Sequence, residues 1–290
     1  MSANGAAEFW NTKELSETYA NNSRDFFRPT TDKVLQLAEE LVDRTTARNI
    51  LDLASGTGNP AIRLALAFPD CHVHATDLAP AMLKVLDASA TDLKISNISS
   101  SVVDAKDLAF AGNASYDAIT FSLGLQLVKD TAKCLSECAR VLKPGGALII
   151  SVPGPISKTD GARTTKEVHD RVIPSDPWMD VNAMGTGDAL KTAAEKAGFQ
   201  QLCVSEVNNP ITGSLDQMKA ISIRGLLSAG LKTEDEQRKK RHGPDAKSCY
   251  AEADKILEEL LRQYGWLQAD GLIHLPSNVA IVLSAVKPMS

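Results

Sequence analysis

The sequence has 290 residues, of which 43% are hydrophobic and 23% are charged. This length suffices for one α/β core of about 200 residues with further segments around it. No run reaches the roughly 18 consecutive apolar residues of a membrane-spanning helix, so we expect no transmembrane segment and no membrane partner. The formal net charge of −5 would repel an extended phosphate backbone, which disfavours nucleic acid as a partner.

The amino terminus and the cysteines favour a cytoplasmic protein. No basic stretch followed by an apolar core occurs in the opening residues MSANGAAEFWNTKELSE, so no secretory signal is expected. The five cysteines are an odd number scattered through the chain, which fits reduced thiols better than a disulfide framework. The one strongly basic run, residues 238–241, follows three acidic residues and is interpreted as a solvated helix end.

Residues 1–45 are expected to form a helical cap, because apolar side chains recur at helical spacing between Val34 and Val42. From about residue 46 to residue 152, short β-rich apolar runs alternate with helical patterns. This alternation is typical of βαβ units around a parallel sheet. The strands are predicted at about 49–54, 71–76, 98–103, 117–122 and 147–152, and the intervening helices at about 60–67, 80–88 and 131–142.

Residues 153–290 are expected to complete the same domain with a lid, a helical insertion and the closing strands. The lid is predicted as a loop and short helix at about 153–185, and the insertion at about 214–265. A helix at about 187–197 and strands at about 200–207 and 278–286 complete the pattern, the last strand being almost wholly apolar. The predicted fold is therefore α/β: a Rossmann-like, doubly wound, mostly parallel seven-stranded sheet with an amino-terminal helical cap and helical insertions over the active site.

A glycine turn joins the first predicted strand to the first helix of the core. In LDLASGTGNPAIRLA, Gly56 and Gly58 lack a β-carbon, so the chain can turn tightly and a ligand can approach the backbone amides and the helix N-terminus. This arrangement predicts a nucleotide-like cofactor. Gly56, Gly58 and Ala61 also match the degenerate dinucleotide fingerprint, so the turn alone leaves a nicotinamide-dependent oxidoreductase open.

Three acidic residues accompany successive strands. Asp77 ends the second strand, and Asp104 follows the third, whereas Asp52 lies inside the first. The carboxyl ends of parallel strands open into one crevice. We expect Asp77 to accept hydrogen bonds from ribose hydroxyls and Asp104 to accept from an adenine amino group, with the amide of Ala105 nearby. Packing explains Asp52 poorly, so this residue is expected either to hold the turn or to receive an amino group of the cofactor.

Five motifs, LDLASGTG, ATDLAPAML, VVDAKDL, YDAITFSLGLQLVKD and RVLKPGG, resemble those of the class I S-adenosylmethionine-dependent methyltransferases, in particular the group that contains the ubiquinone and menaquinone biosynthesis enzymes. The resemblance covers residues 46–152 and implies S-adenosyl-L-methionine as the cofactor. It places the methionine moiety at the glycine turn, Met82 beside the adenine and Ser122 at the start of the loop beneath the sulfonium. The cofactor-binding residues expected are Tyr19, Asp52, Ser55, Gly56, Gly58, Asp77, Leu78, Met82, Asp104, Ala105 and Ser122.

The resemblance implies methyl transfer to a small molecule, an in-line displacement in which positioning can supply most of the catalysis. An amine, thiolate or stabilised carbanion needs little more, whereas an alcohol or phenol usually needs a base or a metal. Leu127 stands where relatives often carry His or Asn, and no metal-site pattern is present, so an N, S or C nucleophile is favoured. His169 or His274 could still serve as the base of an O-methyltransferase, and Trp178 and Trp266 are candidates for the pocket wall.

Two other classes stay open at this point: the nicotinamide-dependent oxidoreductase and a catalytically silent cofactor-binding protein. No Tyr-x-x-x-Lys spacing, which could provide a proton donor for the oxidoreductase, occurs in the sequence. Intact binding motifs do not prove turnover, so the silent protein is not excluded. The acceptor, the catalytic residues and the choice between monomer and homodimer are left open.

Overall fold

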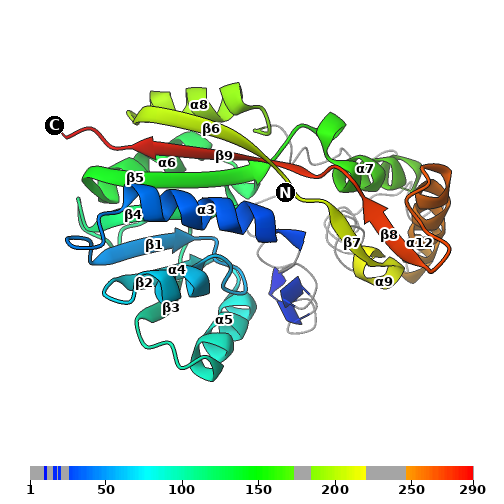
Figure 1. Ribbon diagram of the computed structural model, residues 1–290, viewed down its shortest axis with the longest axis horizontal. Coiled ribbons are helices and arrows are strands. Elements are labelled where there is room, and N and C mark those ends of the chain that lie inside the picture. Colours follow the sequence, from blue (N-terminus) through cyan, green and yellow to red (C-terminus); the bar gives the residue numbers. More distant parts are fainter. Residues whose placement is uncertain are drawn as a thin grey trace.

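The structure, a computed structural model, describes residues 10–11, 16–17, 19–20, 26–172, 184–219 and 246–289. Its main feature is a seven-stranded sheet in the order β3-β2-β1-β4-β5-β9-β6 (Figure 1). Strands β1 to β5 are parallel, and β9 pairs antiparallel with both β5 and β6. The strands are β1 (Asn49–Leu53), β2 (His72–Asp77), β3 (Ile98–Val102), β4 (Tyr116–Ser122), β5 (Leu142–Pro153), β6 (Gln200–Asn208) and β9 (Val279–Val286). The predicted doubly wound, mostly parallel sheet is confirmed.

One strand starts earlier than the sequence predicts. The sequence pattern places residues 143–146 between a helix that ends at about 142 and a strand that begins at about 147, yet they form the beginning of β5. Gly145 donates its amide to Lys287 O, and Gly146 O accepts from Lys287 N, each at 2.9 Å. Pairing with the carboxyl-terminal end of the chain, which no local pattern reveals, therefore extends this strand.

Helices cover both faces of the sheet, and each face has its own apolar cluster. The first face packs against α3 (Arg28–Leu41), α4 (Ala61–Ala67) and α5 (Pro80–Asp92), and the second against α6 (Thr131–Val141) and α8 (Gly187–Lys196). In Figure 1, α3 lies in front of the sheet and α6 behind it. The predicted amino-terminal cap, residues 1–45, thus includes a helix that belongs to a layer of the core.

A smaller unit lies beyond the carboxyl ends of the parallel strands, at the right of Figure 1. It contains the antiparallel pair β7 (Ile211–Ser214) and β8 (Leu272–Leu275), with α7 (Asp160–Val172), α9 (Leu215–Met218) and α12 (Ala246–Gln263) around a third apolar cluster. We call it the β7–β8 unit. The sequence predicted helices here and missed the two strands. Residues 173–183 and 220–245, which belong to the predicted lid and insertion, lie outside the described residues.

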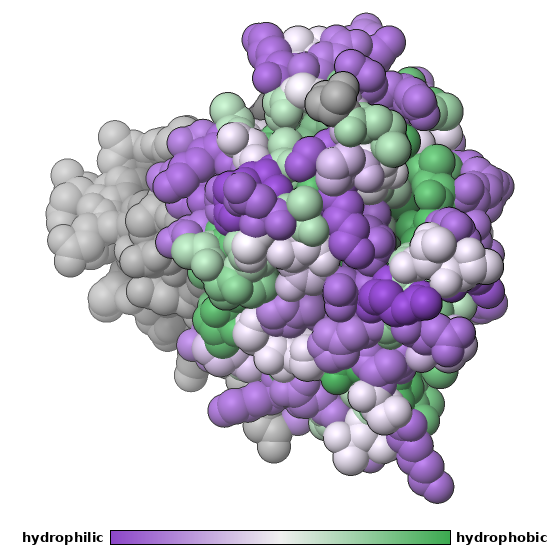
Figure 2. Space-filling model, turned by 90° about the vertical axis from the view of Figure 1, so that its left-hand side faces the viewer, coloured by the Kyte–Doolittle hydropathy of each residue, from purple (hydrophilic) through white to green (hydrophobic). Residues whose placement is uncertain are grey.

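The surface away from the β7–β8 unit is mixed. Figure 2 shows the side that carries the carboxyl-terminal end, where hydrophilic side chains predominate and apolar ones are scattered between them. Within the described ranges, no helix is both long and apolar enough to cross a membrane.

Candidate active site

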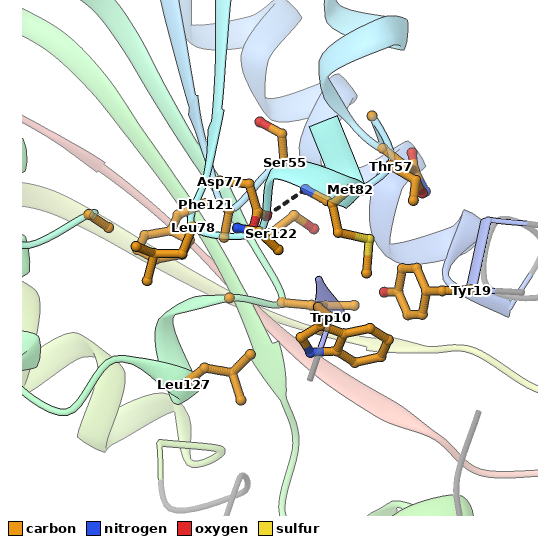
Figure 3. A pocket seen from close by; sticks show the side chains of 18 of the residues that line it. Trp10, Tyr19, Ser55, Thr57, Asp77, Leu78, Met82, Phe121, Ser122 and Leu127 are labelled. Atoms are coloured by element: carbon orange, nitrogen blue, oxygen red, sulfur yellow. Dashed lines mark hydrogen bonds between the residues drawn. The ribbon is translucent and has the colours of Figure 1, made fainter. Parts of the chain in front are cut away.

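A cavity of about 380 Å³ opens at the carboxyl ends of β1, β2, β3 and β4 (Figure 3). This volume lies within the range of about 300–1,000 Å³ that is usual for small-molecule sites. Ten of the eleven residues predicted to bind the cofactor line it, and Asp52 is the exception. The lining comes mainly from the four segments that follow these strands: residues 54–59, 77–82, 103–106 and 121–128. Residues that are far apart in the sequence thus lie together around one cavity.

The two glycines of the turn after β1 serve different purposes. Both have positive φ, 53° at Gly56 and 104° at Gly58. A β-carbon at Gly56 would meet no atom of the other described residues within 4 Å, its two chain neighbours apart, so the space above this residue is open to a ligand. A β-carbon at Gly58 would lie 2.7 Å from Ile62 Cδ1, so its absence lets α4 pack against the turn. One glycine therefore makes room for a ligand and the other for the protein itself.

Asp77 holds the glycine turn in place from the end of β2. Its Oδ2 accepts a hydrogen bond from Gly56 N at 2.9 Å, and its Oδ1 accepts from Ala79 N at 2.8 Å. Burial raises the pKa of this carboxyl, while the amide donors oppose the rise. Each carboxylate oxygen can accept more than one hydrogen bond. Asp77 therefore has the capacity left to accept from ribose hydroxyls.

Ser55 lines the cavity, but its hydroxyl is used within the protein. Ser55 Oγ donates to Asp52 O at 2.9 Å and accepts from Thr76 N at 3.1 Å. These bonds tie the end of β1 to β2. We therefore expect the backbone of Ser55, and not its hydroxyl, to make the predicted contact with the cofactor.

Asp52 lies in β1 just before the cavity and is completely buried. Its Oδ1 accepts a hydrogen bond from the hydroxyl of Thr120, whereas its Oδ2 is buried and has no hydrogen-bond partner among the residues that the structure describes. Burial raises the pKa of Asp52 to about 7, and the charge of Asp77 adds to the rise, against the effect of the hydrogen bond from Thr120. An unpaired buried oxygen costs about 1–3 kcal/mol and is rare in native proteins. Asp52 therefore offers an acceptor for a donor that the described part of the chain does not provide.

Asp104 and Lys106 give the cavity a polar end after β3. Asp104 Oδ1 accepts from Lys106 N at 3.0 Å, and Asp104 Oδ2 lies 3.4 Å from Lys106 Nζ. Ala105 is 9% exposed and packs into the core beneath. Leu78 and Met82 line the cavity from the segment after β2. An acid, a cation and apolar side chains thus surround the region where an adenine ring was predicted.

The segments after β1 and β4 touch each other at the other end of the cavity. A β-carbon at Gly124 would lie 2.6 Å from Ala54 Cβ and 2.5 Å from Phe121 Cε2, so only glycine fits between them. Ala54 and Leu123 adopt positive φ of 51° and 53°, although neither is glycine. Such backbone strain tends to cluster at functional sites. Ser122, which lines the cavity here, has its Oγ 2.9 Å from Ser151 Oγ.

Trp10 is a lining residue that the sequence interpretation missed. Its ring packs edge to face against Tyr19, with 5.0 Å between the ring centroids, and both residues line the cavity (Figure 3). By contrast, Trp266 packs against Tyr264, and Trp178 lies outside the described residues.

The two histidines considered as bases are not among the residues that line the cavity. His169, in α7, is 4% exposed, and its Nδ1 lies 3.4 Å from Asp170 Oδ1. His274, in β8, has its Nδ1 2.9 Å from Thr212 Oγ1. Within the part of the chain that the structure describes, no group of three or more His, Cys, Asp or Glu residues could hold a metal ion.

The chain is similar in sequence to several known proteins. Residues 50–146 match a family described as a methyltransferase domain. The chain is 34% identical over 177 residues to a demethylmenaquinone methyltransferase of Thermus thermophilus, a match that covers 56% of this chain and 79% of that protein. It is 27% identical over 215 residues to the methyltransferase ucsB of an Acremonium species, which covers 69% of this chain and 72% of the relative.

Among solved structures, the chain resembles a phosphoethanolamine N-methyltransferase of Haemonchus contortus in complex with S-adenosylhomocysteine. The TM-score is 0.53 at 21% identity, and the match covers 89% of this chain and 52% of that chain. This likeness concerns the fold. The sequence relatives show that the chain belongs to the class I S-adenosylmethionine-dependent methyltransferases that act on small molecules, whose cofactor is S-adenosylmethionine.

Proposed function

We propose that the protein transfers a methyl group to an N, S or C nucleophile of a small molecule by holding that nucleophile in line with the cofactor. S-adenosylmethionine, when bound, supplies a methyl group on a sulfonium that is already activated for displacement. The protein's contribution is then to orient the two reactants and to exclude water. The eleven predicted residues are proposed to bind the cofactor, with Asp77 at the ribose, Asp104 and Ala105 at the adenine, and Asp52 at the amino group.

The observation that carries this proposal is the absence of a histidine or glutamate among the described residues that line the cavity. Its charged lining residues are Asp77, Asp104, Lys106 and Arg63. The first three lie where ribose and adenine are proposed, and Arg63 forms an ion pair of 2.6 Å with Asp32. The other lining residues include apolar and aromatic side chains: Trp10, Phe27, Phe121, Leu123, Leu127 and Val128. Such a wall favours an acceptor that is nucleophilic without a protein base.

The test is to incubate the protein with S-adenosylmethionine and matched amines, thiols, carbon nucleophiles and phenols, and to measure S-adenosylhomocysteine and methylated product by mass spectrometry. We expect turnover with an amine, thiol or carbon nucleophile. The pH dependence of the rate should follow the ionisation of the acceptor. Turnover with phenols alone, abolished in His169→Gln or His274→Gln, would instead establish an O-methyltransferase with a histidine base. Tight cofactor binding without any product would establish the silent binding protein.

The buried carboxyl of Asp52 predicts a pH dependence for cofactor binding. Because burial raises its pKa to about 7, Asp52 is mostly protonated at pH 6 and mostly ionised at pH 8, and only the ionised form attracts an ammonium group. The affinity for S-adenosylhomocysteine should therefore rise about tenfold from pH 6 to pH 8. Isothermal titration calorimetry across this range measures the effect, and Asp52→Asn should flatten it.

The raised pKa of Asp52 lowers the stability of the ligand-free protein as the pH rises, whereas it increases the affinity for the cofactor. A carboxyl whose folded-state pKa is raised stabilises the fold below its unfolded pKa of about 3.9, and this contribution is lost as the pH rises through about 7. The free energy of unfolding of the wild type should thus fall between pH 6 and pH 8 relative to Asp52→Asn. Equal pH profiles of the two proteins, in both binding and unfolding, would contradict the assignment of this proton to Asp52.

A further inference from the structure

Helix α3 begins without a capping side chain of its own. Its N-cap residue is Phe27, which makes no side-chain hydrogen bond to the first turn. The first backbone N–H groups of a helix lack partners within the helix, and a side chain at the N-cap normally accepts from one of them. A phenyl ring cannot do this, so the acceptor has to come from elsewhere in the chain.

Asn209 supplies that acceptor from 179 residues away in the sequence. Its Oδ1 accepts hydrogen bonds from Thr30 N at 3.0 Å and from Thr30 Oγ1 at 2.9 Å. Asn209 is 2% exposed, and Thr30 is completely buried. The contact is therefore an internal helix cap, shielded from water.

Asn209 connects α3 to the two segments that join the main sheet and the β7–β8 unit. Asn209 lies between β6 and β7, where the chain leaves the main sheet, and the first turn of α3 lies beside this point in Figure 1. Its Nδ2 donates to Asn278 O at 3.0 Å, in the segment through which the chain returns from β8 to β9. One buried side-chain amide thus joins the start of α3 to both of these connecting segments.

The side chains around the start of α3 lie in two different regions. Phe26 belongs to the apolar cluster of the β7–β8 unit, where a β-carbon at Gly213 would lie 3.2 Å from Phe26 Cζ. Phe27 and Thr31 instead line the cavity at the carboxyl ends of β1 to β4. The position at which α3 begins therefore determines where these two wall residues lie.

We propose that Asn209 is a positioning residue for the cofactor site. It is not among the residues that line the cavity, and it acts through the first turn of α3 on Phe27 and Thr31. This inference rests on the proposed use of the cavity for S-adenosylmethionine. Loss of the Asn209 cap lets the start of α3 shift, which displaces the wall before any cofactor binds.

Three variants test the proposal by isothermal titration calorimetry with S-adenosylhomocysteine. Asn209→Ala removes the acceptor and should raise the Kd about tenfold, which corresponds to about 1.4 kcal/mol. Asn209→Asp keeps an oxygen for Thr30 but loses the donor to Asn278, and its Kd should stay within about threefold of the wild type. Asn208→Ala is the matched control, because among the described residues the neighbouring side chain bonds to the return segment alone, at Asn278 N and Pro276 O.

A kinetic measurement separates positioning from a general loss of structure. In Asn209→Ala the KM for S-adenosylmethionine should rise, while kcat at saturating cofactor should stay within about twofold, because α3 contributes no reacting group. If Asn209→Ala does not fold, Thr30→Val, which removes only the hydroxyl donor, should show a smaller rise of the same kind.

Two results would overturn the inference. The first is wild-type affinity for S-adenosylhomocysteine in Asn209→Ala, or in Thr30→Val if Asn209→Ala does not fold. The second is an equal loss of that affinity in Asn208→Ala. A wild-type protein that fails to bind S-adenosylhomocysteine would instead overturn the proposed function, whatever the variants do.

Discussion

Replacing Asp77 with alanine should weaken the binding of S-adenosylhomocysteine at least about 100-fold. The carboxylate accepts from Gly56 N and Ala79 N, and it is proposed to accept from the ribose hydroxyls as well. Hydrogen bonds to a charged group contribute about 1.5–3 kcal/mol each, so loss of two ribose contacts accounts for about two to four orders of magnitude in affinity. Isothermal titration calorimetry measures the change directly.

The control for this variant is Asp87→Ala, which removes an exposed carboxylate from α5, the helix that follows Asp77. It should bind like the wild type. The melting temperature of each ligand-free variant establishes that the protein remains folded at the temperature of the titration. Unchanged affinity in a folded Asp77→Ala protein would mean that the ribose binds elsewhere.

Gly56→Val should also abolish most cofactor binding, for a steric reason. The side chain would enter the open space above the turn, where no atom of the other described residues, the chain neighbours apart, lies within 4 Å of the β-carbon position. We expect a Kd at least about 100-fold higher, equivalent to about 2.7 kcal/mol. Valine at positive φ also strains the backbone by about 1–2 kcal/mol, which lowers stability but does not by itself displace a ligand.

Gly265 provides a matched control for that strain. It has a positive φ of 70°, its β-carbon position is equally open, and it follows α12, outside the set of residues that line the cavity. Gly265→Val should therefore lower the melting temperature about as much as Gly56→Val but leave cofactor affinity unchanged. If the two variants lost affinity equally, the open space at Gly56 would not be the cofactor site.

Most of the sheet could be predicted from the sequence, because its strands are short apolar runs between glycine turns and amphipathic helices. The buried run of β9 and the turn after β1 illustrate this: both carry their signal within a few neighbouring residues. The placement of Asp77 and Asp104 followed from topology, since the carboxyl ends of neighbouring parallel strands lie together. Their roles toward the cofactor stay predictions, which the variants above test.

The features that the sequence did not reveal depend on contacts between distant residues. Strands β7 and β8 have four residues each, and their pairing joins segments about 60 residues apart, such as Thr212 and His274. The cap of α3 by Asn209 has no local signature either, because an asparagine after a strand is common in loops. Trp10 is bracketed by residues without a helical or strand period, so nothing in its neighbourhood distinguished it from a surface tryptophan.

The most direct test of the central claim is a thermal-shift comparison of the wild-type protein with S-adenosylmethionine, S-adenosylhomocysteine and a nicotinamide dinucleotide. A ligand present at 100 times its Kd stabilises the folded state by about 2.7 kcal/mol. The cavity described above predicts a rise in melting temperature with the first two ligands, reduced in Asp77→Ala and absent with the dinucleotide. A rise with the dinucleotide alone would contradict the account of the glycine turn and of the cavity built around it.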